Sequence, residues 1–185
     1  MTWLTLTSDE QSALLLSGKV ALACALATLV PGMFCGWLLA RKRFWGKSLL
    51  DALVHLPLVV PPTAIGYLLL LLLGRNGPLG RWLHESLGFD VAFTWRAAVV
   101  ASAVMGFPLM VRAVRLAIEL IDARTEDAAR VLGAAPLRVF ATITLPLALP
   151  GVVTGLVLCF ARSLGEFGAT ITFAGNMAGE TRTLP

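Results

Sequence analysis

Arg162 and Glu166 are the two residues of this sequence whose type and spacing point most directly to a chemical role. They lie four positions apart in a long apolar block, so both side chains share one face of a helix. A charged residue inside such a block is costly to bury and by default indicates a functional site. Two interpretations stay open: the residues form an ion pair that only lowers this cost, or they line a gate or polar pathway.

Motifs of enzymes do not occur in the sequence. There is no HExxH, no GxSxG and no cluster of His and Asp residues that would indicate a membrane-embedded hydrolase, and no P-loop that would bind ATP. Cys24, Cys35 and Cys159 lie in apolar blocks without CxxC spacing, so we expect them to pack as small apolar residues. The sequence therefore predicts no catalytic residue, no metal site and no cofactor bound by this chain.

The composition is typical of a membrane protein. Of the 185 residues, 57% are apolar and only 14% are charged, and the mean hydropathy is +0.81. A soluble domain of this size needs more polar surface to cover its core. The formal net charge of +4 comes from Lys and Arg residues beside the apolar blocks, without the interleaved aromatic residues of a nucleic-acid surface. We therefore predict an all-α integral membrane protein that does not bind nucleic acid.

Four apolar blocks are long enough to cross a bilayer as helices, since about 20 apolar residues suffice. The predicted spans cover residues 12–40, 48–74, 95–120 and 147–173, within a single transmembrane domain of residues 1–185. Three prolines, Pro57, Pro61 and Pro62, interrupt the second block. Broken helix is tolerated at membrane depth only where it is buried in protein or lines a cavity. This block is therefore a candidate pathway lining, and a kink that serves only packing is the alternative.

Basic residues gather in two connections that lie on the same side of the membrane if every block crosses once. The segment 41–47 holds four of them and the segment 112–138 holds five. Basic residues in short loops mark the cytoplasmic side, so the N-terminus is predicted to be periplasmic. The last residues then also lie outside, and we expect at least one further span beyond residue 185. A complete protein of four spans is the alternative.

The polar segment between the third and fourth blocks, residues 119–146, has the signals of two short helices. Thr125 is a good N-cap, and Glu126 and Asp127 place negative charge in the first helical turn, where the helix dipole favours it. Gly133 suits a left-handed residue that ends this helix, and Pro136 suits the first turn of the next one. A short, rigid helix in this position is suited to docking into another protein.

The same segment resembles a loop of known membrane proteins. It reads Asp127-Ala128-Ala129, three residues, Gly133, nine residues, then Ile143-Thr144-Leu145-Pro146. This spacing resembles the EAA loop of ABC-importer permeases, which is Glu-Ala-Ala, three residues, Gly, nine residues, Ile-x-Leu-Pro. Asp127 replaces the usual Glu and keeps its charge. The resemblance implies the type I ABC-importer permease fold and a cytoplasmic segment that couples to an ATPase subunit. Its residues would be Thr125, Glu126, Asp127, Ala128, Ala129, Gly133, Ala134 and Pro136.

Two further stretches, residues 55–67 and 163–173, resemble the permeases of molybdate importers and, more loosely, those of sulfate and thiosulfate importers. The resemblance extends from about Ser12 to Pro185. It implies a homodimer in the lipid of the cell inner membrane, two partner subunits that hydrolyse ATP, and a periplasmic molybdate-binding protein that supplies the oxyanion.

Residues of the translocation pathway can be named only as candidates. They are Pro61, Pro62, Thr63, Arg162, Ser163, Glu166 and Thr170. Hydroxyls, backbone amides and arginine are the groups expected to meet an oxyanion. A sulfate or thiosulfate permease is the nearest alternative. A secondary transporter is a more distant one, since it would be expected to show inverted repeats and more intramembrane carboxylates.

Overall fold

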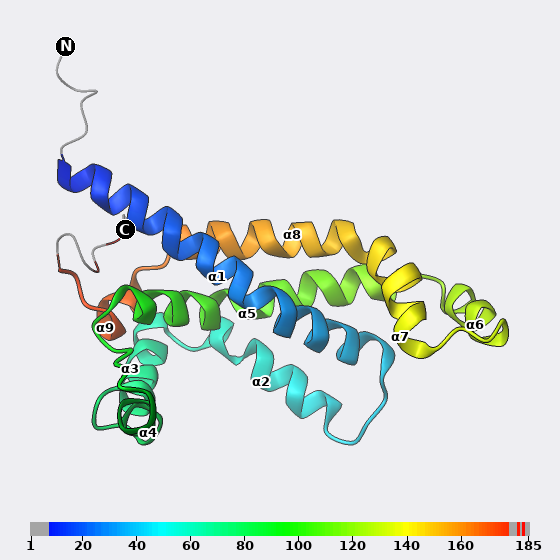
Figure 1. The fold of residues 1–185 in the computed structure, drawn as a ribbon, viewed down its shortest axis with the longest axis horizontal. Helices are drawn as coiled ribbons and strands as arrows, with labels where there is room; N and C mark the ends of the chain where they lie inside the picture. The colour runs from blue at the N-terminus through cyan, green and yellow to red at the C-terminus, as the bar shows by residue number, and fades with distance from the viewer. Residues whose placement is uncertain (1–7, 178–180, 182, 184–185) are drawn as a thin grey trace, which may run out of the picture.

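The computed structural model describes residues 8–177, 181 and 183, and every regular element in this part of the chain is helical. The last residues of the expected resemblance, 178–180, 182 and 184–185, lie outside the described set. Three long helices, α1 (Ser8–Arg41), α5 (Trp95–Glu119) and α8 (Leu145–Leu164), run side by side (Figure 1). The shorter elements are α2 (Lys47–Val59), α3 (Pro62–Leu73), α4 (Pro78–Leu87), α6 (Ala123–Val131), α7 (Pro136–Val139), a π-helical turn η1 (Phe140–Thr144) and α9 (Gly168–Phe173). The prediction of an all-α protein is confirmed.

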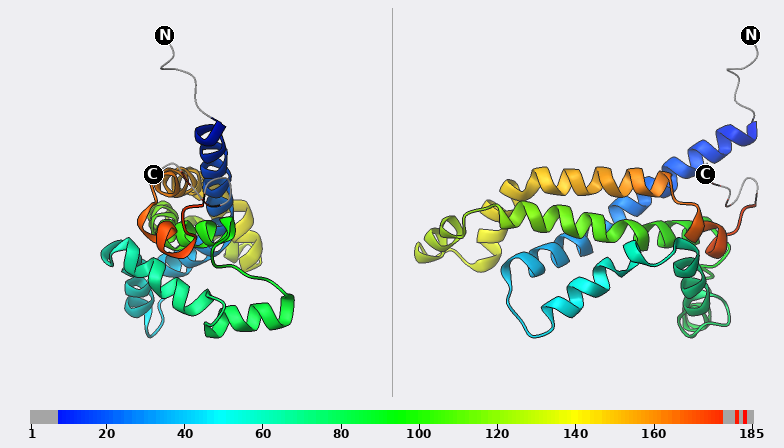
Figure 2. Two further views of the ribbon diagram at one scale, coloured as in Figure 1. Left: turned by 90° about the vertical axis from the view of Figure 1, so that its left-hand side faces the viewer. Right: turned by 180° about the vertical axis from the view of Figure 1, so that it is seen from behind.

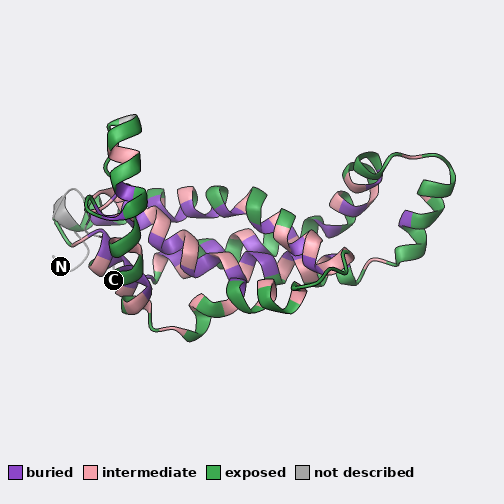
Figure 3. Ribbon diagram, turned by 90° about the horizontal axis from the view of Figure 1, so that it is seen from below, coloured by how far each residue is buried: buried purple, intermediate pink, exposed green. Residues whose placement is uncertain are grey.

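Helix α5 is the centre of the bundle and packs against α1, α8, α2 and α9. Its small and apolar residues, among them Ala97, Ala101 and Val114, are buried. Figure 3 shows that burial follows the inner faces of the helices, whereas their outer faces are exposed. The exposed side chains include Val30 on α1 and Val157 on α8. An apolar outer face of this extent suits a lipid environment, because it would be unfavourable in water.

Two glycines let α8 approach α5 closely. A Cβ atom added to Gly151 would press on the Cβ of Ala117 and lie 2.9 Å from the carbonyl oxygen of Ala113. A Cβ atom on Gly155 would lie 3.3 Å from the Cα of Met110 and closer still to its sulfur. This is the small-xxx-small packing that replaces hydrophobic association between helices in membranes.

Replacing Gly151 with leucine is therefore expected to separate α8 from α5 and to destabilise the subunit by about 1–3 kcal/mol, as overpacked sites do. The measurement is the thermal unfolding midpoint of the purified protein in detergent. Gly18→Leu is the matched control, because a Cβ atom on Gly18 of α1 meets nothing within 4 Å. Equal midpoints for the two variants would contradict the close α5–α8 packing.

Helices occupy all four of the expected spans, and two of these stretches contain a break. Residues 12–40 and 95–120 match α1 and α5. The second block, 48–74, is broken as its prolines predict, because α2 and α3 meet at Val60–Pro61 with an angle of 113°. The fourth block, 147–173, is also divided, since α8 ends at Leu164 and α9 begins at Gly168.

The broken fourth block has a local physical cause. The carboxylate of Glu166 turns back and accepts a hydrogen bond from the amide of Ala169 (2.9 Å), which satisfies the first turn of α9 instead of continuing α8. Among the described residues, three helices are long and apolar enough to cross a membrane, or four if α2 and α3 together form one span. Helix α4 lies in the polar stretch between the second and third apolar blocks.

The short elements gather at the two ends of the bundle. Helices α6 and α7 and the connection from α1 to α2 lie at one end, and α3, α4 and α9 lie at the other (Figures 1 and 2). The two basic connections of the sequence therefore share one end of the molecule. A direct contact confirms this arrangement, because Arg41 at the end of α1 forms an ion pair with Glu126 of α6 (3.0 Å).

Candidate functional site

Helix α6 begins earlier than the sequence pattern suggested. Its N-cap is Asp122, whose carboxylate accepts a hydrogen bond from the amide of Arg124 (2.9 Å). The prediction that Thr125 is the N-cap is therefore wrong, and Thr125 lies inside the first turn. Aspartate is a somewhat better N-cap than threonine, so the upstream residue is favoured where both are available. Glu126 still lies in the first turn, as predicted, whereas Asp127, which was also predicted there, lies beyond it because the helix begins earlier.

The turn after α6 has the predicted geometry. Gly133 is left-handed, with φ of +83°. Its amide donates to the carbonyl of Arg130 (2.9 Å), and the amide of Ala134 donates to that of Ala129 (3.0 Å). Such bonds satisfy the last carbonyls of a helix that ends in a left-handed residue. Pro136 then occupies the first turn of α7, as predicted.

The unit formed by α6, the Gly133 turn and α7 projects from the bundle and carries exposed apolar side chains. Val131 and Leu132 are each 87% exposed, and Leu137 is 79% exposed. Asp127 is exposed beside them and pairs with Arg130 (3.0 Å). Exposed leucine and valine gathered in this way mark a surface that contacts another protein or the membrane. We call residues 123–137 the coupling unit, after the role that the resemblance to the EAA loop implies.

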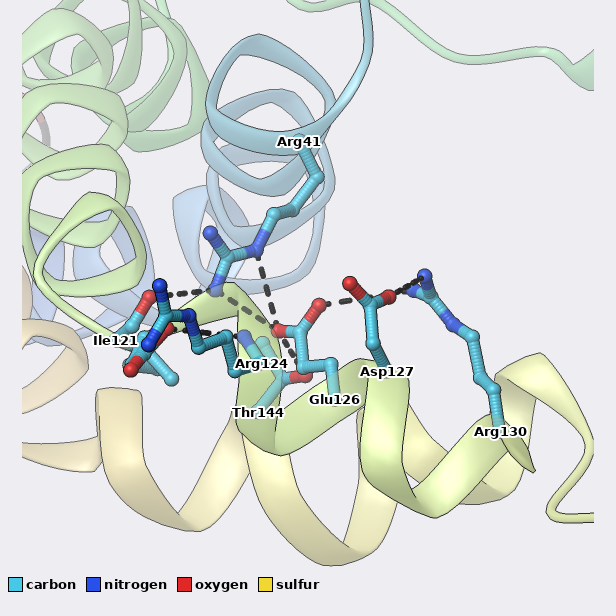
Figure 4. A network of polar contacts seen from close by, with 8 residues as sticks. Arg41, Ile121, Arg124, Glu126, Asp127, Arg130 and Thr144 are labelled. Carbon is cyan, nitrogen blue, oxygen red and sulfur yellow. Dashed lines mark hydrogen bonds and ion pairs between the residues drawn. The ribbon is translucent and has the colours of Figure 1, made fainter. Parts of the chain in front are cut away.

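Glu126 is the buried residue of α6, and its carboxylate joins several elements (Figure 4). Its Oε1 atom accepts hydrogen bonds from Arg41 Nε (3.1 Å), Arg41 Nη2 (3.0 Å) and Thr144 Oγ1 (2.8 Å). Arg41 Nη2 also donates to the carbonyl of Ile121 (3.0 Å). Arg130 approaches Glu126 Oε2 at 3.6 Å. The side chain of Glu126 is only 4% exposed and that of Arg41 17%.

The sequence pattern predicts Glu126 in a first helical turn, where the helix dipole favours its charge, but it does not indicate the partners of the carboxylate. Arg41 lies 85 positions away in the sequence, and no local pattern joins the two residues. A usable signal was present in part, because Arg41 directly follows the first apolar block and has no acidic neighbour nearby in the sequence. Thr144 lies at the variable position of the Ile-x-Leu-Pro motif, so the motif itself did not mark it.

The candidate pathway residues meet at the opposite end, where the two helix breaks pack together. Helices α3 and α9 lie side by side. A Cβ atom on Gly168, at the start of α9, would lie 2.9 Å from Pro62 Cβ and 3.4 Å from the amide of Thr63. The structure thus places the break at Pro61–Pro62 against the break at Gly165–Gly168, two sites about a hundred residues apart in the sequence.

Arg162 and Glu166 form an ion pair beside these breaks. Arg162 Nη1 lies 2.7 Å from Glu166 Oε2, and the side chains are 29% and 1% exposed. The expected ion pair is therefore present. Because the other oxygen of Glu166 accepts from Ala169, the same carboxylate both pairs with Arg162 and starts α9. The end of α8 is held to α9 through this one side chain.

The three candidate hydroxyl residues differ in exposure. Ser163 and Thr170 are buried, and Thr170 Oγ1 donates to the backbone carbonyls of Glu166 (3.0 Å) and Phe167 (2.9 Å). Thr63 is exposed at the start of α3. Of these three residues, Thr63 alone is exposed. Among the described residues, no group of three or more His, Cys, Asp and Glu side chains could hold a metal ion.

Comparison with known proteins gives matches along most of the chain. Residues 32–184 match the model of the family described as binding-protein-dependent transport system inner membrane component. The molybdenum transport system permease protein ModB of Escherichia coli (strain K12) is 59% identical over 97% of this chain and 79% of its own length. ModB of Haemophilus influenzae is 58% identical over 95% and 77%. The sulfate transport system permease protein CysT of Escherichia coli is 41% identical over 82% of this chain and 54% of its own length.

Proposed function

The chain belongs to the family of binding-protein-dependent transport system inner membrane components, and from that premise we propose that it is the permease subunit of an ATP-driven molybdate importer. The observation that carries this proposal is the exposed coupling unit. It has the residue spacing of an ATPase-docking loop, and it presents Val131, Leu132 and Leu137 to solvent at one end of the bundle. The degree of identity to the molybdenum permeases supports molybdate over sulfate as the substrate.

The coupling unit would connect the permease to the subunit that supplies its energy. A partner ATPase subunit would cover the apolar side chains of α6 and α7 and hydrolyse the ATP, since the sequence has no P-loop. This end of the bundle would then face the cytoplasm, which agrees with the basic residues in the connections beside it. The N-terminus would be periplasmic. A periplasmic binding protein would deliver the oxyanion to the opposite end.

The pathway would run past the paired helix breaks, between two copies of this chain in a homodimer. Breaks at Pro61–Pro62 and Gly165–Gly168 free backbone groups that require a polar or protein-buried surrounding at membrane depth. The exposed hydroxyl of Thr63 and the partly exposed guanidinium of Arg162 are suited to transient contact with an oxyanion. Affinity in the pathway can be low, because the binding protein would supply it.

Transport by the complete assembly tests this proposal. The permease, its ATPase and the binding protein are reconstituted in vesicles, and uptake of labelled molybdate is followed with ATP and with excess unlabelled sulfate. We expect ATP-dependent uptake that sulfate does not suppress. Suppression by sulfate to the same degree as by unlabelled molybdate would contradict selectivity for molybdate over sulfate. Failure of an ATPase subunit to co-purify would contradict the importer class itself.

A further inference from the structure

Glu126 and its partner Arg41 together join four separate parts of the chain: Glu126 Oε1 accepts from Arg41 and Thr144, and Arg41 also donates to the carbonyl of Ile121. Arg41 ends α1, Ile121 lies in the connection from α5 to α6, Glu126 belongs to α6, and Thr144 ends the π-helical turn that leads into α8. Figure 4 shows these side chains converging between α6 and the end of α1. We call Arg41, Glu126 and Thr144 the α1–α6–α8 link.

Helix α6 has little else to hold it to the bundle. Its other residues are exposed or only partly buried, and Glu126 is the buried one. The chain enters α6 through a short connection after α5 and leaves it at the left-handed Gly133. Without the link, these two points would let α6 turn relative to α1 and α8. With it, a charged and nearly solvent-free contact fixes the helix in place.

The link is stiffer than an exposed ion pair of the same length. Arg41 donates two bonds from its planar guanidinium to one carboxylate oxygen and a third to a backbone carbonyl, which fixes its orientation. Both side chains are largely removed from water, so separating the charges without a new partner is strongly unfavourable. A displacement of α6 is therefore shared by the end of α1 and the start of α8.

We propose that the α1–α6–α8 link transmits the movement of the ATPase-docked coupling unit to the two long helices α1 and α8. This inference rests on the proposed function, and it assigns Arg41, Glu126 and Thr144 as positioning residues that contact neither ATP nor the transported anion. It separates two tasks within the coupling unit. The exposed apolar residues hold the ATPase, and the buried carboxylate passes on the force.

The test compares Glu126→Gln and the double variant Arg41→Gln/Glu126→Gln with the wild type in the reconstituted importer. Three quantities are measured: ATPase co-purification, binding-protein-stimulated ATP hydrolysis, and molybdate taken up per ATP hydrolysed. We expect the ATPase to remain bound and to hydrolyse ATP, while uptake per ATP falls about tenfold, within the usual range of coupling between sites. The double variant leaves no unpaired buried charge, so we expect its folding to be less affected. The contact between the two glutamines is uncharged and therefore weaker than the wild-type ion pair.

Two further variants keep the test decisive. Thr144→Val removes one hydrogen bond at nearly constant shape, and we expect a smaller loss of uptake per ATP, about two- to fivefold. Glu119→Gln is the matched control, because it removes the half-exposed partner of Arg115 at the same end of the bundle, and uptake per ATP should be unchanged.

Unchanged uptake per ATP in all link variants would overturn the proposal. So would loss of ATPase binding, which would make the link part of the docking surface. If the wild type itself fails to bind an ATPase or to take up molybdate, the proposed function fails instead.

Discussion

Replacing Arg162 with methionine is expected to destabilise the folded subunit by about 3–5 kcal/mol, the cost of leaving a buried charge without its partner. Glu166 is 1% exposed, and Arg162 is its ion-pair partner at 2.7 Å. Methionine fills the space of the aliphatic part of arginine but leaves the carboxylate, among the described residues, with the amide of Ala169 as its one remaining partner. The measurement is the thermal unfolding midpoint of the purified subunit in detergent, which should fall markedly.

An exposed ion pair with the same spacing serves as the control, because it shows the effect of losing a partner without burial. Arg81 and Glu85 have the same spacing and a contact of 2.8 Å, but their side chains are 73% and 63% exposed. Arg81→Met is therefore expected to change stability by less than about 1 kcal/mol. If Arg162→Met lowers the unfolding midpoint no more than Arg81→Met does, then the ion pair with Arg162 does not stabilise the buried Glu166.

The double variant Arg162→Met/Glu166→Gln decides between the two roles that the sequence left open. Glutamine can still accept the bond from Ala169 while carrying no charge, so most of the lost stability should return. Uptake of labelled molybdate by the reconstituted variant then reports on function alone. Normal uptake would make the pair a structural device, whereas lost uptake in a stable protein would assign it to the pathway.

Features encoded by a few neighbouring residues were predictable from the sequence. The left-handed turn at Gly133, the helix start at Pro136 and the break at Pro61–Pro62 each follow from the backbone preferences of one or two residues. The α1 and α5 spans follow from apolar length. These local preferences are kept in the folded protein because they agree with its tertiary packing.

Features that depend on a partner far along the chain were not predictable. The spacing of Arg162 and Glu166 indicated a pair, but the second bond of Glu166, which starts α9 and divides the expected span, depends on how the chain turns after Leu164. The sequence pattern placed Glu126 in a first helical turn and indicated no partner for its carboxylate. Its burial follows from the approach of Arg41, which is fixed by the packing of α1 against α5 and α8.

Replacing Gly133 with valine is expected to weaken binding of the ATPase subunit about tenfold to a hundredfold. A β-branched residue in the left-handed region costs about 1–3 kcal/mol of backbone strain, and every 1.4 kcal/mol is a factor of ten in affinity. A Cβ atom at position 133 meets nothing within 4 Å, so no clash inside the subunit contributes. The strain is relieved by turning α7 relative to α6, which moves Leu137 away from Val131 and Leu132. Co-purification of the ATPase with the permease measures the effect.

Two controls connect this loss to the coupling unit. Gly88 ends α4 in the same left-handed conformation, with φ of +63° and nothing within 4 Å of an added Cβ atom, but it lies at the opposite end of the bundle. Gly88→Val should therefore carry similar strain and leave ATPase binding unchanged. Gly133→Asn should retain most of the binding, because asparagine tolerates the left-handed region. If Gly133→Val binds the ATPase normally, or Gly88→Val loses it equally, then the turn at Gly133 does not shape the docking surface and the coupling unit must lie elsewhere.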